Sequence, residues 1–246
     1  MLSQSSLLLI TLCLFLSACS SAPVVQQNPS VLFQEGEEFY ANRNYEDAIA
    51  QWKRVKETYA SPELTALAEV KIADAQFEAK NYIEAAASYE DFRKLHPGHE
   101  KAAYALYRIG LCNYNQIEGI DVDQTPVKNA DIMFDAFLRQ YPASEYAPDA
   151  RSKLEAVRTK QLQHEIYVGR FYYIYGKYPA AVKRLEETLV RFPTSPLNDE
   201  TLYYLGAAYL QISEKEKGRN AFNRLVNEYP SSQFLPKAAK ILEKYY

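Results

Sequence analysis

Apolar side chains recur every three to four residues from about residue 30 to the end of the chain. This period places them on one face of an α-helix, and the sequence shows no Val- and Ile-rich alternation that would favour strands. Prolines and short polar turns divide the pattern into segments, because a proline cannot continue a helix. The sequence therefore predicts an all-α protein. The predicted helices cover residues 30–41 and 45–59, 63–79 and 82–95, 101–115 and 125–140, 148–175 and 178–191, 197–212 and 216–228, and a closing helix begins near 236.

A short motif returns five times along these segments. It consists of a small residue, a large and usually aromatic residue four positions later, and a proline about eight positions after that. In four copies a glycine stands twelve residues before the small residue, if an insertion of eight residues is allowed in the third copy. Such a period indicates a superhelical solenoid of about five helical hairpins, with function on an extended surface. The motif residues are Ala48, Trp52 and Pro62; Ala85, Tyr89 and Pro97; Ala130, Phe134 and Pro142; Ala181, Leu185 and Pro193; Gly218, Phe222 and Pro230; the glycines are Gly36, Gly110, Gly169 and Gly206.

The motif resembles the tetratricopeptide repeat. In that repeat the glycine of the first helix allows the two helices of a hairpin to approach closely, and we expect the small residue of the second helix to fill the same crossing. The large residue is then expected to pack beneath the first helix of the next hairpin. The alternative is a coiled coil or a plain bundle, which would need sustained heptads that the chain lacks.

The N-terminus predicts export and a lipid anchor. Residues 2–18 are apolar and uncharged, too few to span a membrane comfortably, and they end in small residues before Cys19. The string Leu-Ser-Ala-Cys resembles a bacterial lipobox, although no basic residue precedes the apolar run. The resemblance implies cleavage before Cys19 and acylation of its thiol; the alternative is an ordinary secretory signal. Ser20 after the cysteine implies sorting to the outer membrane, facing the periplasm, and the polar residues 19–30 read as a flexible tether.

Charge is distributed unevenly along the mature chain. Residues 19–143 carry 12 Lys and Arg against 19 Asp and Glu, a net charge of −7, whereas residues 144–246 carry 16 against 12, a net charge of +4. Opposite signs indicate two partner-facing surfaces, although many of these charges belong to solvated helix faces. Neither half is basic enough to bind nucleic acid.

The sequence contains no recognisable catalytic or cofactor motif. His96 and His99 flank a Pro-Gly turn without further ligands for a metal, and Asp121 and Asp123 match only a fragment of a calcium loop. Cys112 stands in an apolar setting that favours a buried, inert thiol over a reactive one. We therefore expect a protein that is not an enzyme and that holds neither cofactor nor metal.

A closer resemblance comes from the combination of lipobox, tether, repeats, an insertion in the third hairpin and an overlong first helix in the fourth. Residues 135–150 read DAFLRQYPASEYAPDA, and a long charged helix and GRFYYIYGKYPAAVKRLEETLVRFPTS follow. These features resemble the BamD-like family of outer-membrane lipoproteins over nearly the whole mature chain. The family implies a non-enzymatic scaffold for β-barrel assembly. Its partners would be the POTRA domains of BamA, other Bam lipoproteins and unfolded outer-membrane proteins. The alternative is a repeat adaptor of another envelope machine, Tol-associated cell-wall coordination or type IV pilus assembly.

Two sets of candidate binding residues follow. The first lies on the first helices of hairpins one to three, where aromatic rings edged by carboxylates suit an extended peptide that ends in an aromatic residue. The 21 tyrosines exceed what packing alone requires, although any single one is as easily core. Within this set, Arg108 is the cation expected to meet a terminal carboxylate. The set comprises Phe33, Glu37, Tyr40, Asp74, Phe77, Tyr104, Tyr107, Arg108 and Tyr114.

The second set consists of cations in the last two hairpins, and the resemblance implies that they dock on BamA. Arg184 occupies the position where the family carries an arginine implicated in this contact, and arginine suits a paired interface carboxylate. The alternative is a surface arginine that pairs with Glu186 or Glu187. The set comprises Arg170, Lys177, Lys183 and Arg184. The expected organisation is a signal peptide at 1–18, a tether at 19–30, a peptide-binding part at 31–143 and a docking part at 144–246.

Overall fold

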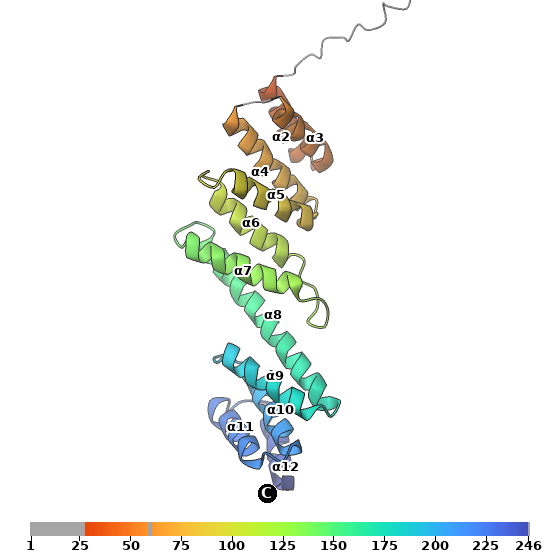
Figure 1. Ribbon diagram of the computed structural model, residues 1–246, viewed down its shortest axis with the longest axis vertical. Coiled ribbons are helices and arrows are strands. Elements are labelled where there is room, and N and C mark those ends of the chain that lie inside the picture. Colours follow the sequence, from red (N-terminus) through yellow and green to blue (C-terminus); the bar gives the residue numbers. More distant parts are fainter. Residues whose placement is uncertain (1–27, 59–60, 246) are drawn as a thin grey trace, which may run out of the picture. The chain divides into compact units, whose positions relative to one another are not determined.

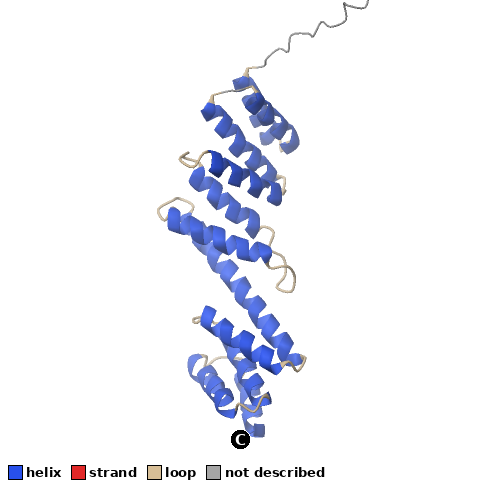
Figure 2. Cartoon of the chain, viewed as in Figure 1, coloured by secondary structure: helices blue, strands red, loops and turns tan. Residues whose placement is uncertain are grey.

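The computed structural model describes residues 28–58 and 61–245, and within them the chain forms eleven α-helices and no strand (Figures 1 and 2). Every helix begins within two residues of its predicted start, and every helix with a predicted end finishes within two residues of it. The prediction of an all-α solenoid of helical hairpins is confirmed. The predicted signal segment, most of the tether and Cys19 lie outside the described residues. The helices are α2 (Pro29–Ala41), α3 (Tyr45–Glu57), α4 (Pro62–Glu78), α5 (Tyr82–Leu95), α6 (Ala102–Tyr114), α7 (Thr125–Gln140), α8 (Ala147–Ile174), α9 (Tyr178–Arg191), α10 (Asn198–Gln211), α11 (Lys215–Glu228) and α12 (Leu235–Tyr245).

The described part of the chain divides into two compact units, one up to Ala68 and one from Glu69 onward. The division falls inside α4, so the first unit holds α2, α3 and the beginning of α4, and the second unit holds the rest. The expected boundary between a peptide-binding part and a docking part, at 143/144, lies in the turn between α7 and α8, within the second unit. It concerns function and stays a prediction.

Trp52 is the centre of the first unit's core. Its indole is fully buried, and Nε1 donates a hydrogen bond to the carbonyl oxygen of Phe33 at 3.2 Å. Leu32 from α2 and Val55 from α3 are buried with it. Because burial of a large apolar side chain stabilises a fold by about 1.5–3 kcal/mol, these side chains hold the first hairpin together.

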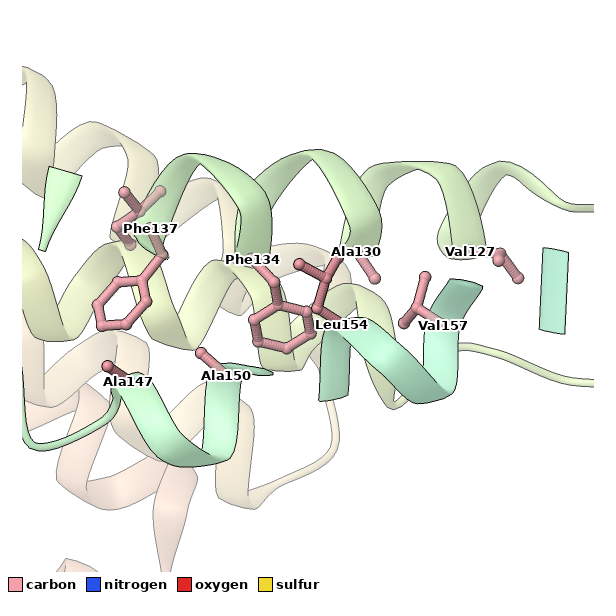
Figure 3. Packing of buried hydrophobic residues seen from close by; sticks show 9 residues of the cluster. Val127, Ala130, Phe134, Phe137, Ala147, Ala150, Leu154 and Val157 are labelled. Atoms are coloured by element: carbon pink, nitrogen blue, oxygen red, sulfur yellow. The ribbon is translucent and has the colours of Figure 1, made fainter. Parts of the chain in front are cut away.

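In the second unit, each helix packs on its neighbour in the chain. Phe134 and Phe137 of α7 are fully buried against the start of α8, where Ala147 and Ala150 leave room for the two rings (Figure 3). Leu154 of α8 extends the same cluster. Alternation of large and small residues across facing helices fills the space between them without voids.

The glycines of the first helices lie against the large motif residue. A Cβ added at Gly110 would lie 2.7 Å from the ring of Phe134, and one at Gly206 would lie 2.9 Å from the ring of Phe222. The large residue therefore lies against the glycine of its own hairpin. In the fifth copy the small motif residue lies at the same crossing, as expected, since a Cβ added at Gly218 would lie 3.1 Å from the carbonyl oxygen of Gly206. The glycine makes space for a ring, which explains why the two positions recur together.

Helix α8 is twice as long as its partner α9, with 28 residues against 14. Its first half packs against α7, and its second half packs against α9, where Gly169 meets Leu185 (Figure 1). The two neighbouring helices α7 and α9 therefore pack on different halves of α8. Among the described helices, α8 included, none combines the length and apolar character needed to cross a membrane.

Candidate functional site

A polar centre lies where α4, α5 and α6 meet in the second unit. Oδ1 of Asp74 accepts two hydrogen bonds, one from the hydroxyl of Tyr104 at 2.7 Å and one from the hydroxyl of Tyr89. Nη2 of Arg108 lies 4.0 Å from the same oxygen. The structure thus brings together Asp74, Tyr104 and Arg108, which the sequence assigned to one surface, and adds Tyr89 from α5.

Arg108 is held on several sides. Its guanidinium carbon lies 3.8 Å from the ring centroid of Phe77, and Nη2 lies 3.4 Å from Oε1 of Glu78. The side chain is only 13% exposed, and its buried Nε has no hydrogen-bond partner among the described residues. This Nε is enclosed by the protein and not open to a ligand, and a peptide carboxylate would have to compete with Asp74 and Glu78 for the rest of the guanidinium.

Burial and the neighbouring charge of Asp74 raise the pKa of Tyr89 and the pKa of Tyr104 above the ordinary value of a tyrosine. Both hydroxyls are therefore neutral across the physiological range and act as donors to the carboxylate. These hydrogen bonds and ion pairs join α4, α5 and α6, and such a network stiffens the surrounding helices. The polar centre thus fixes the positions of the aromatic rings around it.

A second aromatic cluster joins α6 to the beginning of α8. The ring of Tyr107 stacks on that of Tyr146 with a centroid distance of 4.9 Å and an interplanar angle of 13°, and Tyr146 also contacts Tyr104 at 5.6 Å. The hydroxyl of Tyr107 donates to Oδ2 of Asp149 at 2.6 Å. Sequence reasoning missed Tyr146, although it lies in the stretch 135–150 that carried the family resemblance. Tyr114 lies further along α6. Nζ of Lys153, from α8, lies 5.1 Å from the centroid of its ring.

The candidates in the first unit form part of a hairpin core. The rings of Phe33 and Tyr40 lie 6.3 Å and 5.8 Å from that of Trp52, and both residues are half-buried. Glu37, on the same helix, is half-buried as well. These three residues belong to a different compact unit from Asp74 and Arg108. Their role in peptide binding stays a prediction.

The cations expected to dock a partner lie on α8 and α9 or in the turn between them. Nη1 of Arg184 lies 3.0 Å from Oε2 of Glu165, so the alternative pairing with Glu186 or Glu187 on its own helix is wrong. Arg170 makes an ion pair with Glu200 of α10 at 3.2 Å.

Two lysines complete the docking set. Lys177 precedes α9, Lys183 lies within it, and both are exposed. They are therefore accessible to a partner without the loss of an ion pair between helices.

The residues considered for metal binding have structural roles. Nε2 of His96 lies 2.8 Å from Oε2 of Glu69, and Oδ1 of Asp123 accepts a hydrogen bond from the backbone N–H of Thr125 at 3.0 Å. Within residues 28–58 and 61–245, no group of three or more His, Cys, Asp or Glu side chains is placed to hold a metal ion. Cys112 is fully buried, and burial raises the pKa of its thiol to about 12, as expected for an inert cysteine.

Stacked helical hairpins with a recurring glycine and large-residue crossing define a helical-repeat protein of the tetratricopeptide kind. The chain belongs to the YfiO family, described as outer membrane lipoproteins, whose model matches residues 25–221. The outer membrane protein assembly factor BamD of Caulobacter vibrioides is 26% identical over 220 residues, covering 89% of this chain and 72% of that protein. The protein of the same name from Neisseria meningitidis serogroup A is 25% identical over 250 residues, covering 94% of each chain.

A solved structure, the TPR2AB-domain:pHSP90-complex of yeast Sti1, is similar at 15% identity with a TM-score of 0.47, covering 88% of this chain and 85% of that one. The assignment of the fold rests on the hairpins described above. The relatives are named as assembly factors for outer membrane proteins, and the fold is that of a helical-repeat scaffold. The prediction that the protein is not an enzyme is confirmed on this ground.

Proposed function

We propose that this protein is a non-enzymatic scaffold for the assembly of β-barrel proteins in the outer membrane. The observation that carries the proposal is the family match over residues 25–221, together with relatives named as outer membrane protein assembly factors. The protein would be anchored by lipid at Cys19 and face the periplasm. Its partners would be a BamA-type barrel protein, other Bam lipoproteins and unfolded outer-membrane proteins.

The part comprising residues 144–246 is proposed to dock on the POTRA domains of the BamA-type protein. Lys177 and Lys183 are exposed, while Arg170 and Arg184 already hold carboxylates of neighbouring helices. Arginine has five N–H donors, so an arginine paired within the chain can still donate to a carboxylate of a partner. The excess of positive charge in this part favours an acidic docking surface.

The aromatic face of α4 and α6 is proposed to bind extended segments of unfolded barrel proteins. Phe77, Tyr104 and Tyr107 supply rigid rings that bury a peptide's side chains at little cost in conformational entropy. The guanidinium of Arg108, which is 13% exposed, supplies positive charge for a peptide carboxylate. The polar centre keeps these groups in place before the peptide arrives, which lowers the cost of binding.

Co-purification from solubilised envelopes tests the docking proposal. Arg184→Glu would place a second carboxylate next to Glu165, so Arg184→Gln is the cleaner change because it removes the charge without repulsion. We expect Arg184→Gln and Lys183→Glu each to reduce recovery of the BamA-type protein several-fold while the thermal unfolding midpoint stays within a few degrees of the wild type. Lys240→Glu, an exposed change on α12, is the control.

Unchanged recovery with both docking variants would remove these residues from the interface. Recovery of Tol or pilus components in place of a POTRA-bearing protein would replace the proposed function with the alternative envelope role.

A further inference from the structure

A cleft of 480 Å³ opens beside the first half of α8, within the second unit. One side is the helix itself, and the other is the segment that leaves α9 and leads to α10. Its lining contains no residue of the polar centre and none of Lys177, Lys183 and Arg184, although Arg184 and the cleft residue Arg191 share the carboxylate of Glu165. Its lining consists of Arg151, Leu154, Glu155, Arg158, Thr159, Leu162, Arg191, Phe192, Pro193, Thr194, Ser195 and Pro196.

The cleft follows from the unequal lengths of α8 and α9. At 1.5 Å per residue, α8 is about 42 Å long and α9 about 21 Å. Helix α9 returns along the second half of α8 and ends at Arg191, whose Nη2 donates to Oε1 of Gln161 at 2.6 Å. The first half of α8 therefore extends beyond the end of α9. The turn that follows Arg191 forms the other wall of the cleft beside this half of the helix.

Three arginines line the cleft against one carboxylate, that of Glu155. Arg158 and Arg191 are also ion-paired within the chain: Nε and Nη2 of Arg158 lie 3.1 Å from Asp131 and 3.1 Å from Asp135, and Nη1 of Arg191 lies 3.7 Å from Glu165. Both side chains remain 50% exposed. A guanidinium has five donors, and these contacts do not use all of them, so each arginine retains N–H groups for a ligand.

Of the three arginines, Arg151 has the fewest partners within the chain. It is exposed, and among the described residues no carboxylate forms an ion pair with it. The apolar side chains of Leu154, Leu162 and Phe192 lie in the same cleft as its charge. Cations beside an apolar wall match a ligand that combines carboxylates with apolar side chains, whereas a small inorganic anion would leave the wall unused.

We infer that this cleft binds an extended acidic segment of a partner protein. Carboxylates of the segment would accept hydrogen bonds from Arg151 and from the free donors of Arg158 and Arg191, and an apolar side chain between them would lie against Leu162 and Phe192. This interaction surface adds to the docking and peptide-binding surfaces proposed above and does not depend on either.

The test uses the full chain in detergent micelles and a fluorescein-labelled peptide, Gly-Leu-Glu-Glu-Leu-Glu-Gly, with binding followed by fluorescence polarisation. The matched probe carries glutamine at each glutamate position. We expect the acidic peptide to bind about tenfold more tightly than the glutamine peptide, because charge-assisted hydrogen bonds are roughly twice as strong as neutral ones. Arg151→Glu should weaken binding of the acidic peptide by about tenfold or more.

Lys160→Glu is the matched control, since Lys160 is exposed on the same helix, does not line the cleft and undergoes the same change of charge. It should change the affinity less than about twofold. Thr194→Trp is an uncharged second variant that places an indole at the cleft and should weaken binding of both peptides. Circular dichroism of each variant shows that the helices are retained.

Equal affinity for the two peptides, or equal loss with Arg151→Glu and Lys160→Glu, would overturn the proposal, because binding would then not depend on the arginines of the cleft. Unchanged binding with Thr194→Trp would place the peptide elsewhere. A labelled single-stranded DNA that binds as tightly and with the same dependence on Arg151 would replace the acidic protein segment as ligand. These measurements use the purified protein, so their failure leaves the BamA co-purification result unaffected.

Discussion

The buried hydroxyl of Tyr89 makes the stability of the second unit sensitive to alkaline pH. Burial, and then the negative charge of Asp74, raise its pKa above the ordinary value of about 10, so the folded protein retains this proton when the unfolded chain has released it. The stabilisation is therefore fully present below about pH 10 and is lost as pH rises above it. The loss amounts to about 1.4 kcal/mol per pH unit for one such group.

Tyr89→Phe tests this assignment. At pH 8 we expect a loss of about 1.5–3 kcal/mol, since a hydrogen bond to a charged group is removed, while Asp74 keeps its contact with Tyr104. Between pH 10 and 11 the variant should lose stability less steeply than the wild type. Urea unfolding followed by circular dichroism across this range measures both effects. Tyr175→Phe, at a side chain that is 66% exposed, is the control; identical slopes for wild type and Tyr89→Phe would contradict the assignment.

Helical periodicity was sufficient to place Asp74, Tyr104 and Arg108 on one surface, because residues on the first helices of consecutive hairpins face the same way. It did not find Tyr89, whose hydroxyl reaches this surface from a second helix. Periodicity describes the faces of single helices, and it cannot show how far a long side chain extends across a crossing. Glu165 was missed as the partner of Arg184 for the same reason, since the pair joins two helices.

At the scale of elements, four of the hairpins turn through the same backbone conformation. The residue two positions before each second helix has a positive φ: 62° at Arg43, 64° at Lys80, 70° at Gly176 and 65° at Ser213. This left-handed conformation favours glycine, yet only one of the four positions has it. The third hairpin, with its inserted loop, departs from the pattern. The turn is thus imposed by packing of the helices on either side and not by the residue that adopts it.

Gly176→Ala and Gly98→Ala form a matched pair that isolates the cost of this conformation. An added Cβ has no atom within 4 Å at either position, but only Gly176 has a positive φ. We expect Gly176→Ala to reduce the free energy of unfolding by about 1 kcal/mol. Gly98→Ala should leave it within about 0.5 kcal/mol of the wild type. Urea titrations of both variants measure the difference, and equal values would show that the left-handed turn carries no strain for alanine.

The helix ends were predictable from the sequence, because prolines and polar turns stop a helix locally and need no tertiary information. The crossing of Gly110 with Phe134 was predicted only in part: the need for a glycine was recognised, but the ring was expected only beneath the next hairpin and not against the glycine of its own hairpin. How a large side chain is shared between two crossings depends on the rotation of its helix about its axis. That rotation is set by the packing of several helices together.

At the scale of the whole molecule, the division inside α4 was not foreseen from the sequence. The repeat motif suggests five equivalent hairpins, and the helical period runs through residue 68 without interruption. In an array of repeats, stability comes from each hairpin and from its interfaces with neighbours. Density of contact between helices is a property of the folded chain, and the sequence pattern does not record it.

The two units contain separate natural probes of unfolding. Trp52, the only tryptophan of the chain, is buried in the first unit, and Cys112 is buried in the second. The first unit has essentially one hairpin and the start of a third helix, whereas the second packs helices from α5 to α12 in succession. Because a short end of a repeat array has fewer neighbour interfaces, we expect it to unfold first.

In a urea titration, the red shift of Trp52 emission should therefore occur at a lower concentration than pulsed alkylation of Cys112, read by mass spectrometry of its peptide. The loss of helical circular dichroism should span both transitions, because it reports all helices. Alkylation is informative here because a buried thiol with a raised pKa reacts only after the surrounding helices have opened. Coincident midpoints for the two probes would mean that the chain unfolds as one cooperative body, and the separation into two units would then have no counterpart in stability.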